Sequence, residues 1–168
     1  MFAIFLTCAI ALLLDLLFGE PKHWHPLVGF GRLAHALESR LNLERYSATQ
    51  RLIAGGAALL VLTLPIVAVL IYLSAQLSGI WLLLLNSLIL WLAIALRSLR
   101  EHGLAVAVPL QNNDLAQAQQ QVSRIVSRQT SALDQPAVAA AATESILENG
   151  ADAVFASLFW FIVAGAPG

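Results

Sequence analysis

The sequence predicts an all-α integral membrane protein of one domain, 1–168, with about four transmembrane helices joined by helical cytoplasmic loops. The chain is 59% hydrophobic and has a mean hydropathy of +0.78, whereas soluble domains are about 45–50% apolar. No charged residue occurs between Leu52 and Leu96. A single membrane topology of these spans places all nine Lys and Arg residues on one face of the membrane. The positive-inside rule makes that face the cytoplasm.

The two central apolar segments, 52–73 and 80–96, are the strongest predicted spans. A spanning helix needs about 20 mostly apolar residues, with a range of about 17–25. The polar, turn-prone stretch Ser74–Gly79 separates the two segments, so they predict a helical hairpin across the bilayer. Buried core helices of a soluble protein are the alternative, but a chain of 168 residues has too little surface to cover two such helices.

The two ends of the chain supply the other predicted spans, 2–18 and 153–168. The first segment carries one charge, Asp15, near its end. A secretory signal peptide is the alternative for this segment, but no basic region precedes the apolar run. The last segment is expected to leave the cytoplasm again. The loops 19–51 and 97–152 are therefore predicted to be cytoplasmic.

Composition also excludes some classes of function. A net charge of −1 and a pI of about 6.4 do not indicate a nucleic-acid partner. Cys8 is the only cysteine, so neither an internal disulfide nor a cysteine-based metal site is available.

The first cytoplasmic loop, 19–51, begins with a turn, Gly19-Glu20-Pro21, that ends the first helix. From Arg32, apolar residues recur at helical spacing, which predicts an amphipathic helix along the membrane face. The basic residues of this loop are expected to contact lipid headgroups. His25 is expected to be structural or to contact substrate, because the sequence offers no full set of zinc ligands around it.

The second cytoplasmic loop, 97–152, is long enough to suggest a function. Asn112 or Asn113 is predicted to cap one helix. Asp134 is predicted to cap the next, with Pro136 in its first turn.

That second helix presents carboxylates at Glu144, Glu148 and Asp152, four residues apart. Side chains at this spacing share a helical face, and like charges there destabilise the helix unless a cation or a basic partner neutralises them. Hard oxygen ligands of this kind suit Mg²⁺ shared with nucleotide phosphates. A solvated acidic face is the simpler interpretation of the spacing alone. Asn149-Gly150 could also end the helix before Asp152.

The turn before this helix contains Arg128, Thr130 and Ser131, which are candidate phosphate contacts.

Several ordered motifs resemble the cobalamin biosynthesis protein CobD/CbiB family, the adenosylcobinamide-phosphate synthases. The resemblance covers essentially the whole chain. It is carried by Asp15–Pro21, His25-Pro26, Gly31-Arg32, Asn113–Ala116, Val126–Leu133 and Glu144–Trp160.

The resemblance implies an enzyme of the bacterial inner membrane that forms an amide bond. Its partners would be adenosylcobyric acid, aminopropanol or aminopropanol phosphate, and membrane lipid. The resemblance leaves open whether the protein forms a homo-oligomer. ATP and Mg²⁺ would be consumed as co-substrate and metal, without a tightly bound cofactor. The implied catalytic residues are Glu144, Glu148, Asp152 and Arg128, with Mg²⁺ on Glu144 and Glu148. The implied substrate contacts are Thr130, Ser131, Asn149, Asp15, Glu20, His25 and Arg32.

The chain departs from the family pattern at Glu20, Gln129, Gly150 and Ser157. Gln129 stands where an Asp is usual, which removes one charge. Family members also continue beyond Gly168, so we expect this chain to correspond to an N-terminal portion. A transporter of a corrinoid or another polar solute, and a catalytically inactive membrane homologue, are the alternatives to the ligase.

Overall fold

The computed structural model describes residues 1–21, 26–42 and 46–168, and every regular element in these ranges is helical. This confirms the predicted all-α fold class. His25 lies outside the described residues. The helices are α1 (Phe2–Phe18), α2 (Pro26–Leu41), α3 (Ala48–Gln76), α4 (Gly79–Ala93), α5 (Leu96–Gln111), α6 (Leu115–Val122), α7 (Gln135–Gly150), the π-helical segment η1 (Ala151–Ala156) and α8 (Ser157–Ala164).

Within the described ranges, three helical stretches are long and apolar enough to cross a membrane: Ala48–Gln76, Gly79–Gln111 and Gln135–Ala164. Helix α1 is apolar but shorter. The protein is therefore an α-helical membrane protein. Helices α3 and α4 meet at Leu77 and Ser78, inside the predicted turn.

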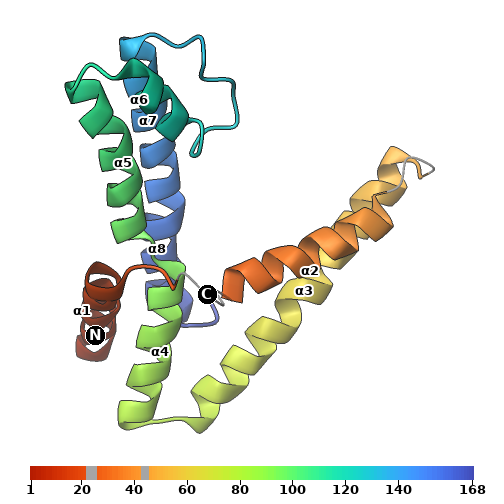
Figure 1. The fold of residues 1–168 in the computed structure, drawn as a ribbon. Helices are drawn as coiled ribbons and strands as arrows, with labels where there is room; N and C mark the ends of the chain where they lie inside the picture. Colours follow the sequence, from red (N-terminus) through yellow and green to blue (C-terminus); the bar gives the residue numbers. More distant parts are fainter. Residues whose placement is uncertain (22–25, 43–45) are drawn as a thin grey trace.

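The main bundle consists of two stacked layers (Figure 1). In the lower layer, α1, α4 and α8 surround a core of Ala11, Leu90, Ile94, Val154 and Phe161. In the upper layer, α5, α6 and α7 surround a second core, which contains Val106, Ala118, Val122, Val138, Ala141 and Ala142. The lower layer is the apolar one, and the upper layer carries the polar residues of the second predicted loop.

Both helical connections between the layers are irregular. The α4–α5 stretch is interrupted at Ile94 and Ala95, and the α7–α8 stretch passes through η1. The hydroxyl of Ser157 donates to the carbonyl of Ala93 at 3.3 Å, so a side chain from one connection satisfies a carbonyl near the break in the other. We call this level, from Ile94 to Arg97 and across to η1, the junction.

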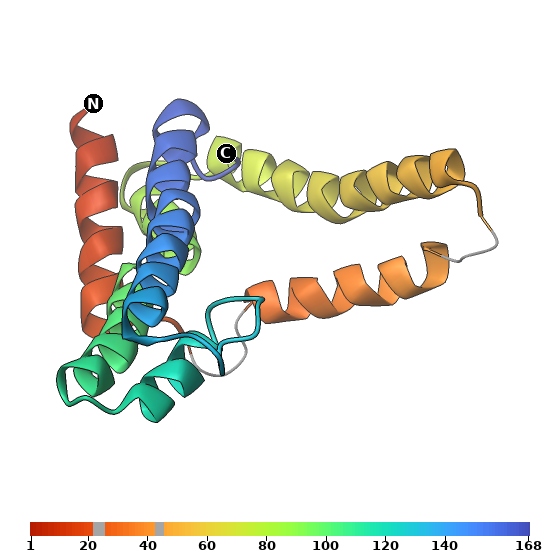
Figure 2. The same cartoon turned by 90° about the horizontal axis from the view of Figure 1, so that it is seen from above.

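Helices α2 and α3 form a hairpin that projects away from the bundle (Figures 1 and 2). Helix α3 begins with a capping box, in which Ser47 accepts from the backbone N–H of Gln50 and the Gln50 side chain accepts from that of Ser47. In these two described helices no residue is buried.

The caps of α6 and α7 test two further predictions. Asp134 caps α7 by accepting from the backbone N–H of Ala137 at 3.0 Å, and Pro136 lies in the first turn, as predicted. The prediction for α6 is wrong, because its cap is Asp114, which accepts from the N–H of Gln117. Asn113 instead adopts a positive φ of 58° in the preceding turn, a conformation that Asn tolerates better than most residues.

Candidate active site on the Arg128 turn and helix α7

Arg128 and Glu144 form an ion pair across the upper layer. The Nη2 of Arg128 donates to the Oε2 of Glu144 at 3.1 Å, joining two predicted site residues that lie 16 positions apart in the sequence. Their side chains are 55% and 70% exposed, so the pair contributes at most about 1 kcal/mol to stability. Its exposure leaves both charges accessible to a solute.

The segment around Arg128 is held in place by three side-chain hydrogen bonds. Thr130 is buried and donates through Oγ1 to the carbonyl of Gln119 at 2.9 Å. The side chain of Gln119 donates to the carbonyl of Leu133 at 2.7 Å. Ser145 of α7, also buried, donates to the carbonyl of Ile125 at 2.6 Å. These contacts tie both ends of the turn to α6 and α7, which presents Arg128 beside Glu144.

The Thr130 side chain therefore supports the turn, because its hydroxyl proton is donated to a backbone carbonyl of the protein. Ser131, the next residue, is exposed and remains on the accessible side.

The acidic face of α7 continues past the ion pair. Glu148 lies one helical turn beyond Glu144 and is exposed. Asn149 donates from Nδ2 to the carbonyl of Ser145 at 2.7 Å and to its hydroxyl at 3.2 Å. The helical path does not end at Asn149-Gly150 but continues into the π-helical segment η1, which carries exposed Asp152.

Glu144 and Glu148 are candidate metal ligands by the chemistry of their side chains. Across the described ranges, no group of three or more His, Cys, Asp or Glu side chains is placed to hold a metal. Mg²⁺ is often bound by one or two carboxylates together with substrate phosphates. Glu144 and Glu148 are carboxylates of this kind, and Arg128, whose guanidinium group suits phosphate, lies beside Glu144.

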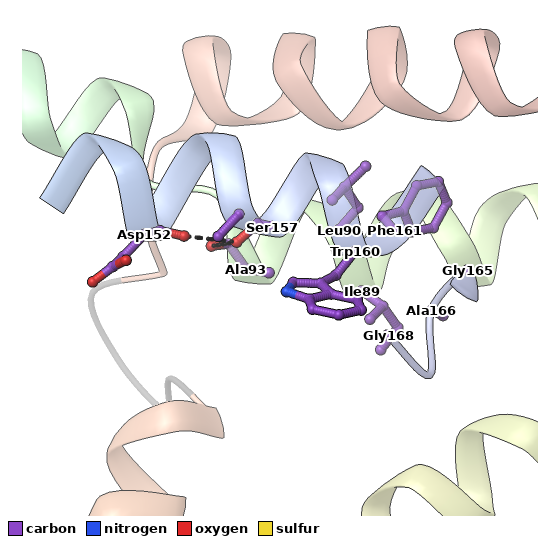
Figure 3. A pocket seen from close by; sticks show the side chains of 11 residues that line it. Ile89, Leu90, Ala93, Asp152, Ser157, Trp160, Phe161, Gly165, Ala166 and Gly168 are labelled. Carbon is purple, nitrogen blue, oxygen red and sulfur yellow. Dashed lines mark hydrogen bonds between the residues drawn. The ribbon is translucent and has the colours of Figure 1, made fainter. Parts of the chain in front are cut away.

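A pocket of about 210 Å³ lies below this face, between the end of α4 and helix α8 (Figure 3). Its lining is mostly apolar, and Leu90, Trp160 and Phe161 contribute large side chains. Asp152 lies at one end, and its carboxylate points away from the other lining side chains (Figure 3). The pocket therefore does not join the acidic face of α7 into one polar cavity.

The predicted site residues of the N-terminal half lie apart from the Arg128–Glu144 pair. Asp15 is fully buried in the lower layer, and its Oδ2 accepts from the backbone N–H of Arg97 at 2.8 Å. Glu20 is exposed in the turn after α1. Arg32 lies on α2 in the projecting hairpin, so the structure does not bring it to the acidic face of α7.

Arg97, which was not among the predicted site residues, makes contacts with both α5 and α1. Its Nε donates to Glu101 at 2.8 Å, and its Nη1 donates to the carbonyl of Leu17 at 2.9 Å. The spacing of Arg97 and Glu101 signals a helical ion pair. Nothing local in the sequence signals the long-range contacts with α1.

The fold and these groups define an all-α membrane protein that carries a basic turn and an acidic helix on one polar layer. The family model described as CobD/Cbib protein matches residues 8–168, and the chain belongs to this family.

Curated relatives agree with this assignment. The chain is 53% identical to the cobalamin biosynthesis protein CobD of Stutzerimonas stutzeri, over 99% of this chain and 54% of the relative. It is 47% identical to the CobD protein of Chromobacterium violaceum, over 95% of this chain and 51% of the relative. A probable CobD protein of Pyrococcus furiosus is 37% identical over 97% of this chain and 55% of the relative. The chain thus spans about half the length of these relatives. No solved structure gives a significant match.

Proposed function

We propose that this protein acts in cobalamin biosynthesis as an ATP-dependent ligase. The reaction joins a carboxylate of adenosylcobyric acid to the amine of aminopropanol or aminopropanol phosphate. The match to the family over residues 8–168 carries this proposal. Because the chain spans about half of its relatives, the activity is proposed for the complete gene product.

The chemistry of amide formation explains why a basic turn should face acidic residues. A carboxylate resists attack by an amine until its oxygen becomes a good leaving group, and ATP with Mg²⁺ would supply that activation. In this proposal Arg128 and Ser131 bind phosphate oxygens, because Arg forms charge-assisted hydrogen bonds to phosphate. Glu144 orients Arg128 in the absence of the nucleotide, as their 3.1 Å contact indicates.

The remaining residues of α7 are assigned supporting parts in the same proposal. Glu144 and Glu148 would hold the Mg²⁺ of the nucleotide. The bound cation would neutralise the repulsion between the two carboxylates, which otherwise destabilises the helix. Asp152 and Asn149 lie further along the same helix and would contact the substrates at its membrane end.

We place this site on the cytoplasmic face of the bacterial inner membrane. The support is the positive-inside rule, since the short turn at Leu77 and Ser78 carries no basic residue, whereas the upper layer carries Arg124 and Arg128. Membrane lipid would surround α3, whose apolar side chains are exposed along its length.

Purified complete gene product incubated with adenosylcobyric acid, aminopropanol phosphate and Mg-ATP tests the proposal. The expected result is a new amide product, detected by mass spectrometry, whose formation requires ATP. Aminopropanol in place of its phosphate determines which amine the enzyme accepts.

Two other outcomes would contradict the ligase. Binding of adenosylcobyric acid without ATP-dependent product would indicate an inactive homologue. Uptake of a corrinoid into sealed vesicles that contain the protein, again without product, would indicate a transporter.

A further inference from the structure

The turn that follows α1 is held from two sides at Gly19. This residue is buried and has a positive φ of 65°, and its backbone N–H donates to the carbonyl of Asp15 at 2.7 Å. Its own carbonyl accepts from the indole Nε1 of Trp91 in α4 at 3.2 Å. A Cβ at this position would lie only 3.2 Å from the Cδ of Arg97. Exposed Glu20 follows directly.

Arg97 joins this turn to α5 through several different contacts. Its backbone N–H donates to the carboxylate of Asp15 at 2.8 Å. Its guanidinium donates to the carbonyl of Leu17 at 2.9 Å, so it satisfies a carbonyl at the end of α1. The aliphatic part of its side chain packs against Gly19, and Nε is held by Glu101 on α5.

No other basic residue in the described part of the chain has comparable burial. Arg97 is partly buried, whereas the remaining Arg residues in the described ranges are exposed, including its neighbour Arg100 on the same helix. A planar, fork-shaped donor group is suited to hold two groups at once, and Lys cannot reproduce this arrangement.

The Arg97 contacts also lie at the junction between the layers. Leu99, one half-turn further along α5, lies against Gly150 of α7, where a Cβ would be 3.9 Å from its Cδ1. The turn after α1 is thereby fixed relative to the helix that carries the acidic face.

We propose that Arg97 is a positioning residue that pins the Gly19–Pro21 turn to the start of α5 and so holds Glu20 at the junction. This inference deepens the proposed function, because it rests on the substrate contact that the family resemblance implies for Glu20, at a place apart from the Arg128–Glu144 pair. Arg97 acts through the turn and does not itself contact the reacting atoms.

A spin-label experiment tests the positioning directly and does not depend on activity. A nitroxide is attached to Glu20→Cys in a Cys8→Ala background, and its mobility is measured by electron paramagnetic resonance in lipid nanodiscs. Arg97→Ala is expected to shorten the rotational correlation time of this label at least twofold. Arg100→Ala is the matched control, since it removes the same charge from an exposed position on the same helix, and it should leave the label unchanged.

A second label, at Ser131→Cys in the upper layer, separates local release from general loosening. It should be unaffected by Arg97→Ala. The milder substitution Arg97→Lys keeps the positive charge but loses the fork-shaped guanidinium group. It should therefore increase the mobility of the label at residue 20 by less than Arg97→Ala does. Unchanged mobility at residue 20 in both Arg97 variants would overturn the proposal, as would equal mobilisation of both labels.

Activity supplies the other half of the test in unlabelled complete gene product. Arg97→Ala should lower kcat/KM at least tenfold, and Arg97→Lys should recover part of that loss. Unchanged kcat/KM despite a released turn would show that the reaction does not need the positioned turn. If the parent protein forms no amide at all, the ligase proposal fails, whereas the label at residue 20 still decides whether Arg97 pins the turn.

Discussion

Asp15 and Arg97 cap each other's helices across the bundle. The carboxylate of Asp15, near the end of α1, accepts the backbone N–H of Arg97 in the first turn of α5 at 2.8 Å. The guanidinium of Arg97 in turn donates to the carbonyl of Leu17 at 2.9 Å, at the end of α1. The residue at the N-cap of α5, Ala95, has no side chain able to cap, so α1 supplies the cap from 82 positions away in the sequence.

The first prediction concerns this exchange of caps. Asp15→Ala should destabilise the protein by about 0.5–2 kcal/mol, because it removes a helix cap and leaves a backbone N–H without its partner. The measurement is the midpoint of thermal unfolding in detergent. Asp15→Asn is the matched variant, since it keeps an acceptor oxygen, and its midpoint of thermal unfolding should fall by less. Equal midpoints for Asp15→Ala and the parent protein would show that the cap contributes nothing.

The second prediction separates a phosphate contact from a structural ion pair at Arg128. Arg128→Ala should raise the KM for ATP about tenfold or more, since a hydrogen bond between charged groups contributes about 1.5–3 kcal/mol. Thermal stability should change little, because the pair with Glu144 is exposed. Arg124→Ala, which removes an exposed arginine four residues earlier in the sequence, is the control. An unaltered KM for ATP would remove Arg128 from the nucleotide site.

The third prediction concerns the acidic face of α7. Glu148→Gln preserves the shape of the side chain and removes its charge, so turnover should fall about 100-fold or more while membrane insertion is retained. Steady-state kinetics measure the loss, and extraction of membranes with carbonate checks the insertion. Glu38→Gln on exposed α2 should be neutral. Full activity of Glu148→Gln would exclude the carboxylate face from the mechanism.

The fourth prediction concerns the orientation of the chain in the membrane. In intact bacterial cells, a membrane-impermeant maleimide should label Ser78→Cys, in the turn between α3 and α4, but not Ser131→Cys. Both substitutions are made in the Cys8→Ala background. Permeabilised cells should label both positions. The reverse pattern in intact cells would place the Arg128 turn outside the cytoplasm.

The apolar spans could be predicted from the sequence because their signal is local. A run of apolar residues without charge between Leu52 and Leu96 is sufficient to indicate a membrane hairpin, and the structure places its turn within the predicted stretch. The cap at Asp134 is local in the same way, since it depends on contacts within three residues. The cap of α6 was placed one or two residues too early, because Asn112, Asn113 and Asp114 are all suitable capping residues and only the backbone path selects Asp114.

The candidate site was predicted in part for the same reason. Glu144 and Glu148 share a face by helical spacing alone, so the sequence places them together. The pairing of Glu144 with Arg128 spans a turn whose path depends on buried Thr130 and Ser145, and spacing cannot specify that path. The burial of Asp15 was not anticipated, because its partner, the N–H of Arg97, belongs to another helix.

By itself, the sequence determined that this chain is a bundle of membrane helices with its charges, apart from Asp15, gathered outside the apolar spans, because hydropathy and helical period act over neighbouring residues. Only the tertiary structure decided where α4 ends and α5 begins, at Ile94 and Ala95, since backbone groups on either side of that break are bonded by side chains from other helices, Asp15 and Ser157. A helix end inside a bundle needs partners for its free backbone groups, and the sequence around the break does not contain them.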